Sequence, residues 1–200
     1  MSNDGTDMLN KILLGTVALY VTLMMGCARP EPDSIKLLNN IISNVSLSQD
    51  DKSSLEAVKA DLSNGKNEAA LDKLDAILKS EIENYYIHAL YVLICIDGGY
   101  WEKAIEPAKR MVSIKPDDTS YLGLGQVYGG NNMLPEAVDA LKKAVELNPN
   151  NAGAREFLGT AYAEMGNKEE AQKEYEILSK VDSSAAMRVQ RVIETGKAQR

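Results

Sequence analysis

The fold is decided by residues 118–151, which read DTSYLGLGQVYGGNNMLPEAVDALKKAVELNPNN. Gly125 and Ala137 are small where two antiparallel helices must cross closely, and Tyr128 and Leu141 are large enough to fill the gap between those helices. A single unit of this kind cannot bury its own apolar face, so it needs similar units on both sides. The stretch therefore predicts a helix-turn-helix unit within a stack.

The spacing of seven residues in this stretch resembles that of the tetratricopeptide (TPR) repeat, a helix-turn-helix unit of about 34 residues. These residues are Leu124, Gly125, Tyr128, Ala137, Leu141, Ala144 and Pro149. Similar spacing recurs, more or less closely, in the units 51–84, 85–117 and 152–185. The resemblance implies an all-α fold, a right-handed TPR α-solenoid of about four helix-turn-helix repeats with flanking helices.

The segments on either side of the repeats have helical patterns of their own. In residues 34–50, Ile35, Leu38 and Ile41 recur at three-residue intervals, which indicates a leading helix with one apolar face. Residues 186–200 are expected to hold a C-terminal capping helix, because a solenoid needs a terminal element with one polar face.

Composition limits the classes of partner. The chain has 200 residues and a formal net charge of -7 at pH 7, so non-specific attraction to nucleic acid is not expected. Its only two cysteines, Cys27 and Cys95, lie in regions of different character, which argues against a disulfide framework.

The N-terminal residues 1–26 have the pattern of a secretory signal peptide. The uncharged run ILLGTVALYVTLMM at 12–25 is too short to span a bilayer comfortably and follows Lys11. Its end, Leu23 to Cys27, resembles the lipobox of bacterial lipoproteins, which implies a type II signal and a lipid on Cys27. Residues 27–33 would then form an extended linker, since they contain two prolines.

Two alternatives remain for this region. Translation from Met8 would remove Asp4 and Asp7 and leave a better signal, whereas an uncleaved signal anchor would leave Cys27 without a role. In both cases the repeats lie outside the cytoplasm, tethered to a membrane and facing the periplasm. In enteric bacteria, an Asp directly after the lipidated cysteine favours retention in the inner membrane. This chain has Ala28 at that position, which favours the outer membrane.

No pattern for catalysis is found. The single histidine, His88, lies in an apolar helix and is interpreted as a packing residue, and metal sites with two imidazoles are excluded. Cys95 is flanked by Ile94 and Ile96, which indicates an inert buried thiol. We therefore expect a protein that is not an enzyme, with no catalytic residue, metal, cofactor or small-molecule substrate.

Function is then expected from surface shape. In TPR proteins the first helix of each repeat lines a concave groove, and the resemblance implies that this groove binds a protein partner. The residues carried over to it are Lys59, Tyr86, Ala89, Leu93, Ile96, Leu122 and Gln126. An apolar groove favours an extended segment or an amphipathic helix of a partner. The alternative is that the leading helix folds into the groove and covers these residues.

The sequence thus predicts a non-enzymatic scaffold, a membrane-anchored TPR lipoprotein of the bacterial cell envelope. It resembles the small TPR lipoproteins that assist assembly of pili and secretion systems. The alternative is an accessory regulatory subunit of an envelope enzyme, such as a peptidoglycan or polysaccharide synthase.

Overall fold

The computed structural model of the chain describes residues 32–44, 48–79 and 84–197. Within these ranges the only regular secondary structure is helical. The helices are α2 (Asp33–Asn44), α3 (Gln49–Ser63), α4 (Asn67–Lys79), α5 (Tyr85–Gly98), α6 (Trp101–Ile114), α7 (Asp118–Gly130), α8 (Leu134–Leu147), α9 (Ala152–Glu164), α10 (Lys168–Leu178) and α11 (Ser183–Thr195).

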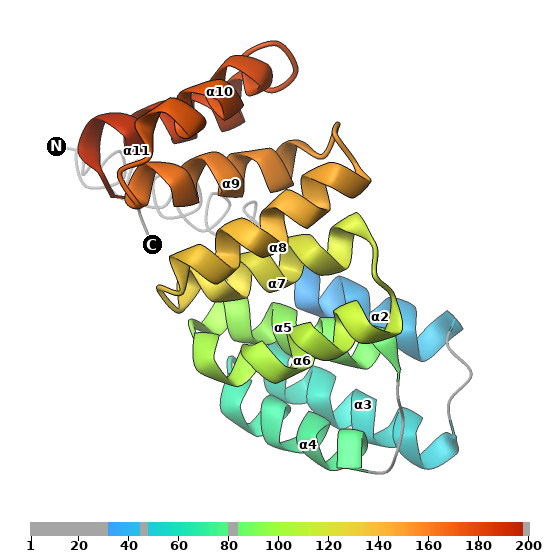
Figure 1. Cartoon of the computed structure of the whole chain (residues 1–200). Helices are drawn as coiled ribbons and strands as arrows, with labels where there is room; N and C mark the ends of the chain where they lie inside the picture. Colours follow the sequence, from blue (N-terminus) through green and yellow to red (C-terminus); the bar gives the residue numbers. More distant parts are fainter. Residues whose placement is uncertain (1–31, 45–47, 80–83, 198–200) are drawn as a thin grey trace, which may run out of the picture.

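The helices stack as antiparallel pairs in chain order (Figure 1). Each pair, α3 with α4, α5 with α6, α7 with α8 and α9 with α10, packs against the next pair along the stack. Helix α11 closes the C-terminal end by packing on α9 and α10, and α2 packs on α3 and α5. The predicted all-α solenoid is confirmed.

The first helix of every pair begins with a side-chain cap. The capping oxygens accept a hydrogen bond from a backbone N–H in the first turn, which satisfies one of the four donors that a helix leaves free at its start. The capping residues are Ser48, Asn84, Asp117 and Asn151, and Asp182 does the same for α11. The second helices α6, α8 and α10 lack such a cap.

The turns inside the pairs share one geometry instead. Gly65, Gly99, Asn132 and Gly166 each have a positive φ, and they follow one another at intervals of 34, 33 and 34 residues. Glycine adopts this conformation without strain, and Asn132 belongs to the residue type that tolerates it best after glycine. The four helix pairs thus share a left-handed residue at the same place in the turn between their helices.

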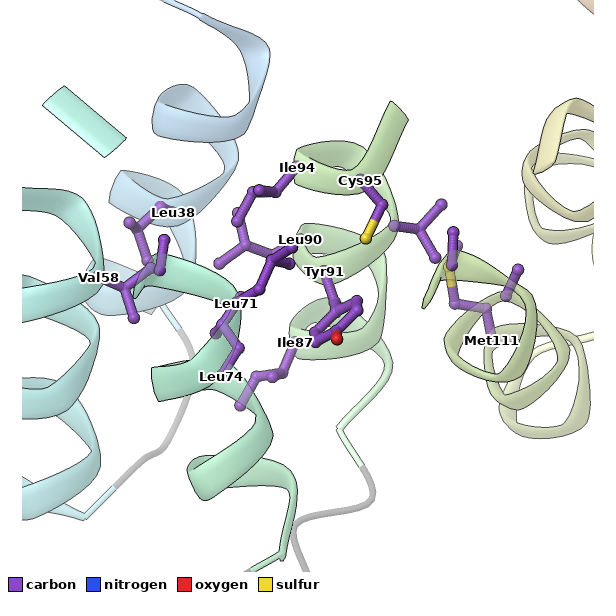
Figure 2. Close-up of a cluster of buried hydrophobic side chains, with 14 of the residues drawn as sticks. Leu38, Val58, Leu71, Leu74, Ile87, Leu90, Tyr91, Ile94, Cys95 and Met111 are labelled. Atoms are coloured by element: carbon purple, nitrogen blue, oxygen red, sulfur yellow. The ribbon is translucent and has the colours of Figure 1, made fainter. Parts of the chain in front are cut away.

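The largest core lies in the first part of the stack. Figure 2 shows side chains from α2 to α6 meeting there, among them Leu38, Val58, Leu71, Leu90 and Met111. All five are at most 5% exposed. Helix α5 supplies more of the buried residues of this core than any other helix, because it is apolar on nearly every side, as a helix surrounded by neighbours must be.

The helices at the two ends of the repeats have clear limits. The segment 34–50 holds most of α2, which ends at Asn44, and the cap and first residues of α3. Helix α11 starts at Ser183, where the Asp182 carboxylate caps it, and includes the first residues of the segment 186–200. The predicted signal peptide, Cys27 and most of the linker lie outside the described residues. No helix within the described ranges combines the length and apolar character needed to cross a bilayer.

Candidate protein-binding face

The first helices of successive pairs form the inner face of the stack. Helix α5 packs on α7, and α7 packs on α9, so side chains from these three helices border one continuous surface. Nearer the N-terminus this arrangement is interrupted, because α2 packs on both α3 and α5. The inner face is therefore covered by α2 at its N-terminal end.

Helix α2 is firmly held in this position. Leu38 and Ile41 are 0% exposed and belong to the same core cluster as Val58 of α3 and Ile94 of α5. In Figure 2, Leu38 lies beside Val58. At the far end of α5, burial raises the pKa of the Asp97 carboxyl, although a hydrogen bond from Ser34 of α2 opposes this rise. Helix α2 therefore lies against the first helices of the first two pairs, although Tyr86, one of the expected groove residues, stays 47% exposed.

Beyond α2, an apolar pocket of about 140 Å³ opens between α7, α8 and α9. Its apolar lining is supplied by Leu134, Ala137, Leu141, Phe157 and Ala161. Its polar lining consists of Gln126, Thr160 and Glu164. Phe157 is 37% exposed, which is unusual for a large aromatic side chain next to a core, and it leaves part of the pocket wall accessible to a ligand.

Small residues create this pocket. A Cβ atom added to Gly125 would lie 2.5 Å from Cγ of Leu141, so only glycine lets α7 approach α8 this closely. Gly129 and Gly130 belong to the lining, and a Cβ atom added to Gly129 would lie 4.0 Å from the Cβ of Ala137. The result is an apolar hollow flanked by closely packed helices.

Polar contacts fix α9, which forms one wall of the pocket. Arg155 Nη1 lies 2.7 Å from Glu174 Oε2, and these side chains are only 12% and 13% exposed. The Arg155 Nε also donates to the Pro149 carbonyl over 2.7 Å. On the other side, Arg188 of α11 makes a two-pronged contact with the Glu156 carboxylate. Helix α9 is thereby tied to both α10 and α11.

The start of α7 is fixed by a carboxylate. Asp118 Oδ2 accepts hydrogen bonds of 2.8 Å from the side-chain amides of Asn148 and Asn151, which lie in the connection from α8 to α9. These two donors hold the pKa of Asp118 below its usual range. The contact joins the third and fourth helix pairs at the N-terminal ends of α7 and α9, away from the pocket-lining residues near their C-terminal ends.

The predicted groove residues fall into two groups. Gln126 lines the pocket, and Leu122 packs beside it against the cluster of Ala137 and Leu158. The other group lies away from the pocket: Lys59 on α3, near Glu56, and Tyr86, Ala89, Leu93 and Ile96 on α5. Of these, Ala89 and Ile96 pack against the first core cluster, whereas Tyr86 is 47% exposed.

Phe157, Leu134 and Glu164 were not among the predicted groove residues. Phe157 follows directly after Glu156, the residue that the repeat spacing places on the inner face. An available signal was that Phe157 is the only phenylalanine of the chain and adjoins the Leu158-Gly159 pair.

The reactive side-chain types in the first core are buried. Cys95 is 0% exposed, and burial raises the pKa of its thiol to about 12, with Lys103 opposing and Asp75 adding to the rise. Burial also raises the pKa of Tyr91, whose hydroxyl lies 3.5 Å from the Asp75 carboxylate. His88 is 8% exposed within α5. A neutral, enclosed thiol is a poor nucleophile.

Comparison with known proteins agrees with this geometry. Residues 130–190 match a family model described as tetratricopeptide repeat. The fold is that of a TPR-type solenoid. No curated protein matches the sequence.

Solved structures of MamA have the same fold. One crystal structure of MamA is 24% identical, with a TM-score of 0.61, over 70% of this chain and 81% of the MamA chain. A second is 23% identical, with a TM-score of 0.63, over 72% and 80% of the two chains. MamA from residue 41 to its end, from Desulfovibrio magneticus RS-1, is 20% identical, with a TM-score of 0.56, over 87% and 94%. At these identities the likeness concerns the fold alone.

Proposed function

We propose that this chain is a protein-binding scaffold that holds a segment of a partner on the inner face formed by α7 and α9. The observation that carries the proposal is the accessible apolar pocket there, lined by Leu141 and Phe157 and bordered by Gln126 and Thr160. Concave, mostly apolar sites with a few polar groups at the edge are typical binding sites. A TPR-type solenoid supports the same function, because it presents an extended inner surface.

We further propose that the scaffold is a lipoprotein of the bacterial cell envelope, attached through Cys27 and facing the periplasm, where it assists assembly of a pilus or secretion complex. The support comes from the sequence, namely the signal-like run 12–25 and the lipobox-like residues before Cys27. Intact mass tests this directly. A lipid-sized mass is expected on the wild type and not on Cys27→Ser, and unlipidated wild type that retains residues before Cys27 would contradict the anchor.

Site-specific crosslinking tests the binding face. A photoreactive amino acid would replace Thr160 at the pocket, and in a matched variant it would replace Glu169, an exposed residue of α10. In membranes from cells that make the protein, the proposal expects one partner to be crosslinked from position 160. Adding Phe157→Asp should remove that product. Equal crosslinking from position 169, or a product at 160 that survives Phe157→Asp, would place the binding site elsewhere.

A further inference from the structure

The chain enters the described structure at the edge of the stack where α5 ends. Helix α2 begins at Asp33, and its second residue, Ser34, is 4% exposed. The Ser34 hydroxyl donates a hydrogen bond to Asp97 in the last turn of α5. The residues that precede α2 therefore leave the stack beside the C-terminal end of α5.

The apolar pocket opens at the same edge. Its lining begins at Gln126 in α7 and at Phe157 in α9, and it continues to the C-terminal ends of these two helices. Trp101, the first residue of α6, lies so close to Gly130 at the end of α7 that a Cβ atom there would collide with its ring. The end of α5, the Trp101 ring and the pocket therefore follow one another along one edge of the stack.

The chain before α2 is long enough to reach the pocket. Packed helices lie about 8–10 Å apart, so a pocket on the far side of α7 from α5 is on the order of 20 Å from the start of α2. An extended chain spans about 3.3–3.6 Å per residue, so the seven steps from Pro32 back to Met25 can cover roughly 23–25 Å. Pro30 and Pro32 favour an extended backbone over this distance.

Met25 is the first large apolar side chain that such a segment brings to the pocket. The intervening residues 26–31 read GCARPE and contain no large apolar side chain. The pocket has a volume of about 140 Å³ and mainly apolar walls, and engineered cavities of about 150 Å³ with similar walls bind benzene. Methionine is flexible and fills irregular apolar hollows well. The pocket therefore has room for this side chain.

Two physical effects favour this contact over an empty pocket. The run at 12–25 carries no charge, so its exposure to water outside a membrane is unfavourable. The run is also tethered to α2, and a short tether gives an effective concentration in the millimolar range. A weak contact is then occupied without a second molecule.

We infer that, in a chain that retains residues 12–25 outside a membrane, Met25 inserts into the pocket between α7 and α9 and closes it. Cleavage of the signal, or uptake of residues 12–25 by a bilayer, withdraws Met25 and opens the pocket. What the contact blocks rests on the proposed function, because the same pocket is the proposed site for a partner segment. Partner binding is thereby coupled to arrival at the membrane.

Crosslinking within the purified full chain tests the contact. The Cys27→Ser chain is used, with intact mass confirming that residues 1–26 are present and that no lipid is attached. A diazirine amino acid of methionine size replaces Met25, and in a matched variant it replaces Met8, which lies outside the apolar run. After removal of detergent, we expect position 25 to label pocket residues of α8 or α9 at least about tenfold more than position 8 does.

Variants of the pocket locate the contact. Phe157→Asp places a carboxylate in the pocket wall and should reduce the product about tenfold. Ile177→Asp, at a side chain of α10 with a similar exposure of 39%, should leave the product unchanged. Far-UV circular dichroism checks that each variant is folded. A product that survives Phe157→Asp in the folded protein, or equal labelling from positions 8 and 25, would overturn the inference.

The membrane dependence is tested with vesicles of phosphatidylcholine. They should take up residues 12–25 and reduce the product from position 25 about tenfold, because a bilayer buries the whole run whereas the pocket buries one side chain. An unchanged product would contradict the proposed opening. Products with the mass of two chains, in place of one, would show that the segment binds a second copy and would also overturn the inference.

The two proposals fail differently. If position 25 gives no pocket product while a partner is crosslinked from position 160 in membranes, the pocket is a partner site that the chain does not close, and the inferred contact is wrong. If position 25 labels the pocket but no partner is crosslinked from position 160, the contact is right and the proposed scaffold function fails in the cells tested.

Discussion

The two ends of the stack are stabilised in different ways. From α2 to α7, and including Ala140 of α8, twenty buried residues form one continuous cluster, with α2 packed on the inner face. The other buried apolar residues of α8 to α11 form three smaller clusters, and ion pairs join α9 to α10 and α11. A helix fills the inner face at one end, and at the other the inner face stays open.

The two parts of the stack therefore differ in how they are stabilised and in how much of their inner surface is accessible. The first part gains its stability from apolar burial, which leaves little of its inner surface for a partner. The second part relies on close backbone approach at Gly125 and on polar contacts around α9, and these leave a hollow beside them. The proposed binding site thus lies where the buried clusters are smallest.

The largest effect should come from weakening the hold on α2. Leu38→Ala removes a fully buried side chain and should reduce the free energy of unfolding by about 4 kcal/mol. The matched change Leu147→Ala, at a residue that is 53% exposed on α8, should cost less than about 1 kcal/mol. Urea denaturation followed by far-UV circular dichroism measures both. Similar losses would mean that α2 is not part of the core.

The next effect tests the ion pair that holds α9. Arg155→Ala leaves the Glu174 carboxylate, which is 13% exposed, without its cation, and should cost about 3 kcal/mol. Arg188→Ala breaks a pair in which the arginine is 50% exposed, so it should cost about 1 kcal/mol or less. Amide hydrogen exchange in α9 to α11 should show the loss locally. Unchanged exchange in Arg155→Ala would show that polar contacts do not stabilise this end.

A smaller effect concerns the close approach of α7 to α8. Gly125→Ala forces Leu141 to move and should cost about 1 kcal/mol after the gain in helix propensity is subtracted. At Gly123, two residues earlier in the same helix, an added Cβ would lie 3.9 Å from Met111 Cε, an ordinary contact. Gly123→Ala should therefore stabilise the protein by about 0.5–1 kcal/mol. Thermal denaturation distinguishes the two signs, and equal shifts would refute the packing argument.

The smallest effect is the pH dependence at Asp118. Hydrogen bonds from Asn148 and Asn151 lower its pKa in the folded protein, so its contribution is complete above the unfolded value of about 3.9 and is lost as the pH falls through the folded value. Because Asp118 is partly exposed, Asp118→Asn should cost less than about 0.5 kcal/mol at pH 7. The difference from wild type should vanish in strong acid, and a difference that grows on acidification would contradict the assignment.

Much of the fold was predictable because the repeat spacing fixes its elements. The Leu-Gly pairs and the turn glycines mark where helices cross and end, and Gln126 was placed on the inner face by its position in the repeat. Leu122 was placed on the same face, next to the pocket. These features depend on residues within one repeat, so a single sequence contains them.

The sequence alone did not show whether α2 covers the inner face of the stack. The stripe of Ile35, Leu38 and Ile41 indicates that one side of α2 is buried, but the same stripe fits the end of the stack or its inner face. Likewise, the pocket depends on how Leu134 and Phe157 are oriented around Ala161, which is a property of packing between repeats. Contacts between distant segments carry no local pattern that spacing can reveal.

The position of α2 also affects when its apolar side can be buried while the chain is being synthesised. Most elements of the stack meet their neighbours in sequence as soon as the next helix leaves the ribosome, whereas Leu38 must wait for Leu90 and Ile94, which emerge about 50 residues later. At translation rates of about 5–20 residues per second, the apolar side of α2 stays uncovered for several seconds. Helix α2 thus waits longer for its partner than a helix that packs on the next one in the chain, and until α5 emerges the nascent chain exposes an apolar segment that other molecules can recognise.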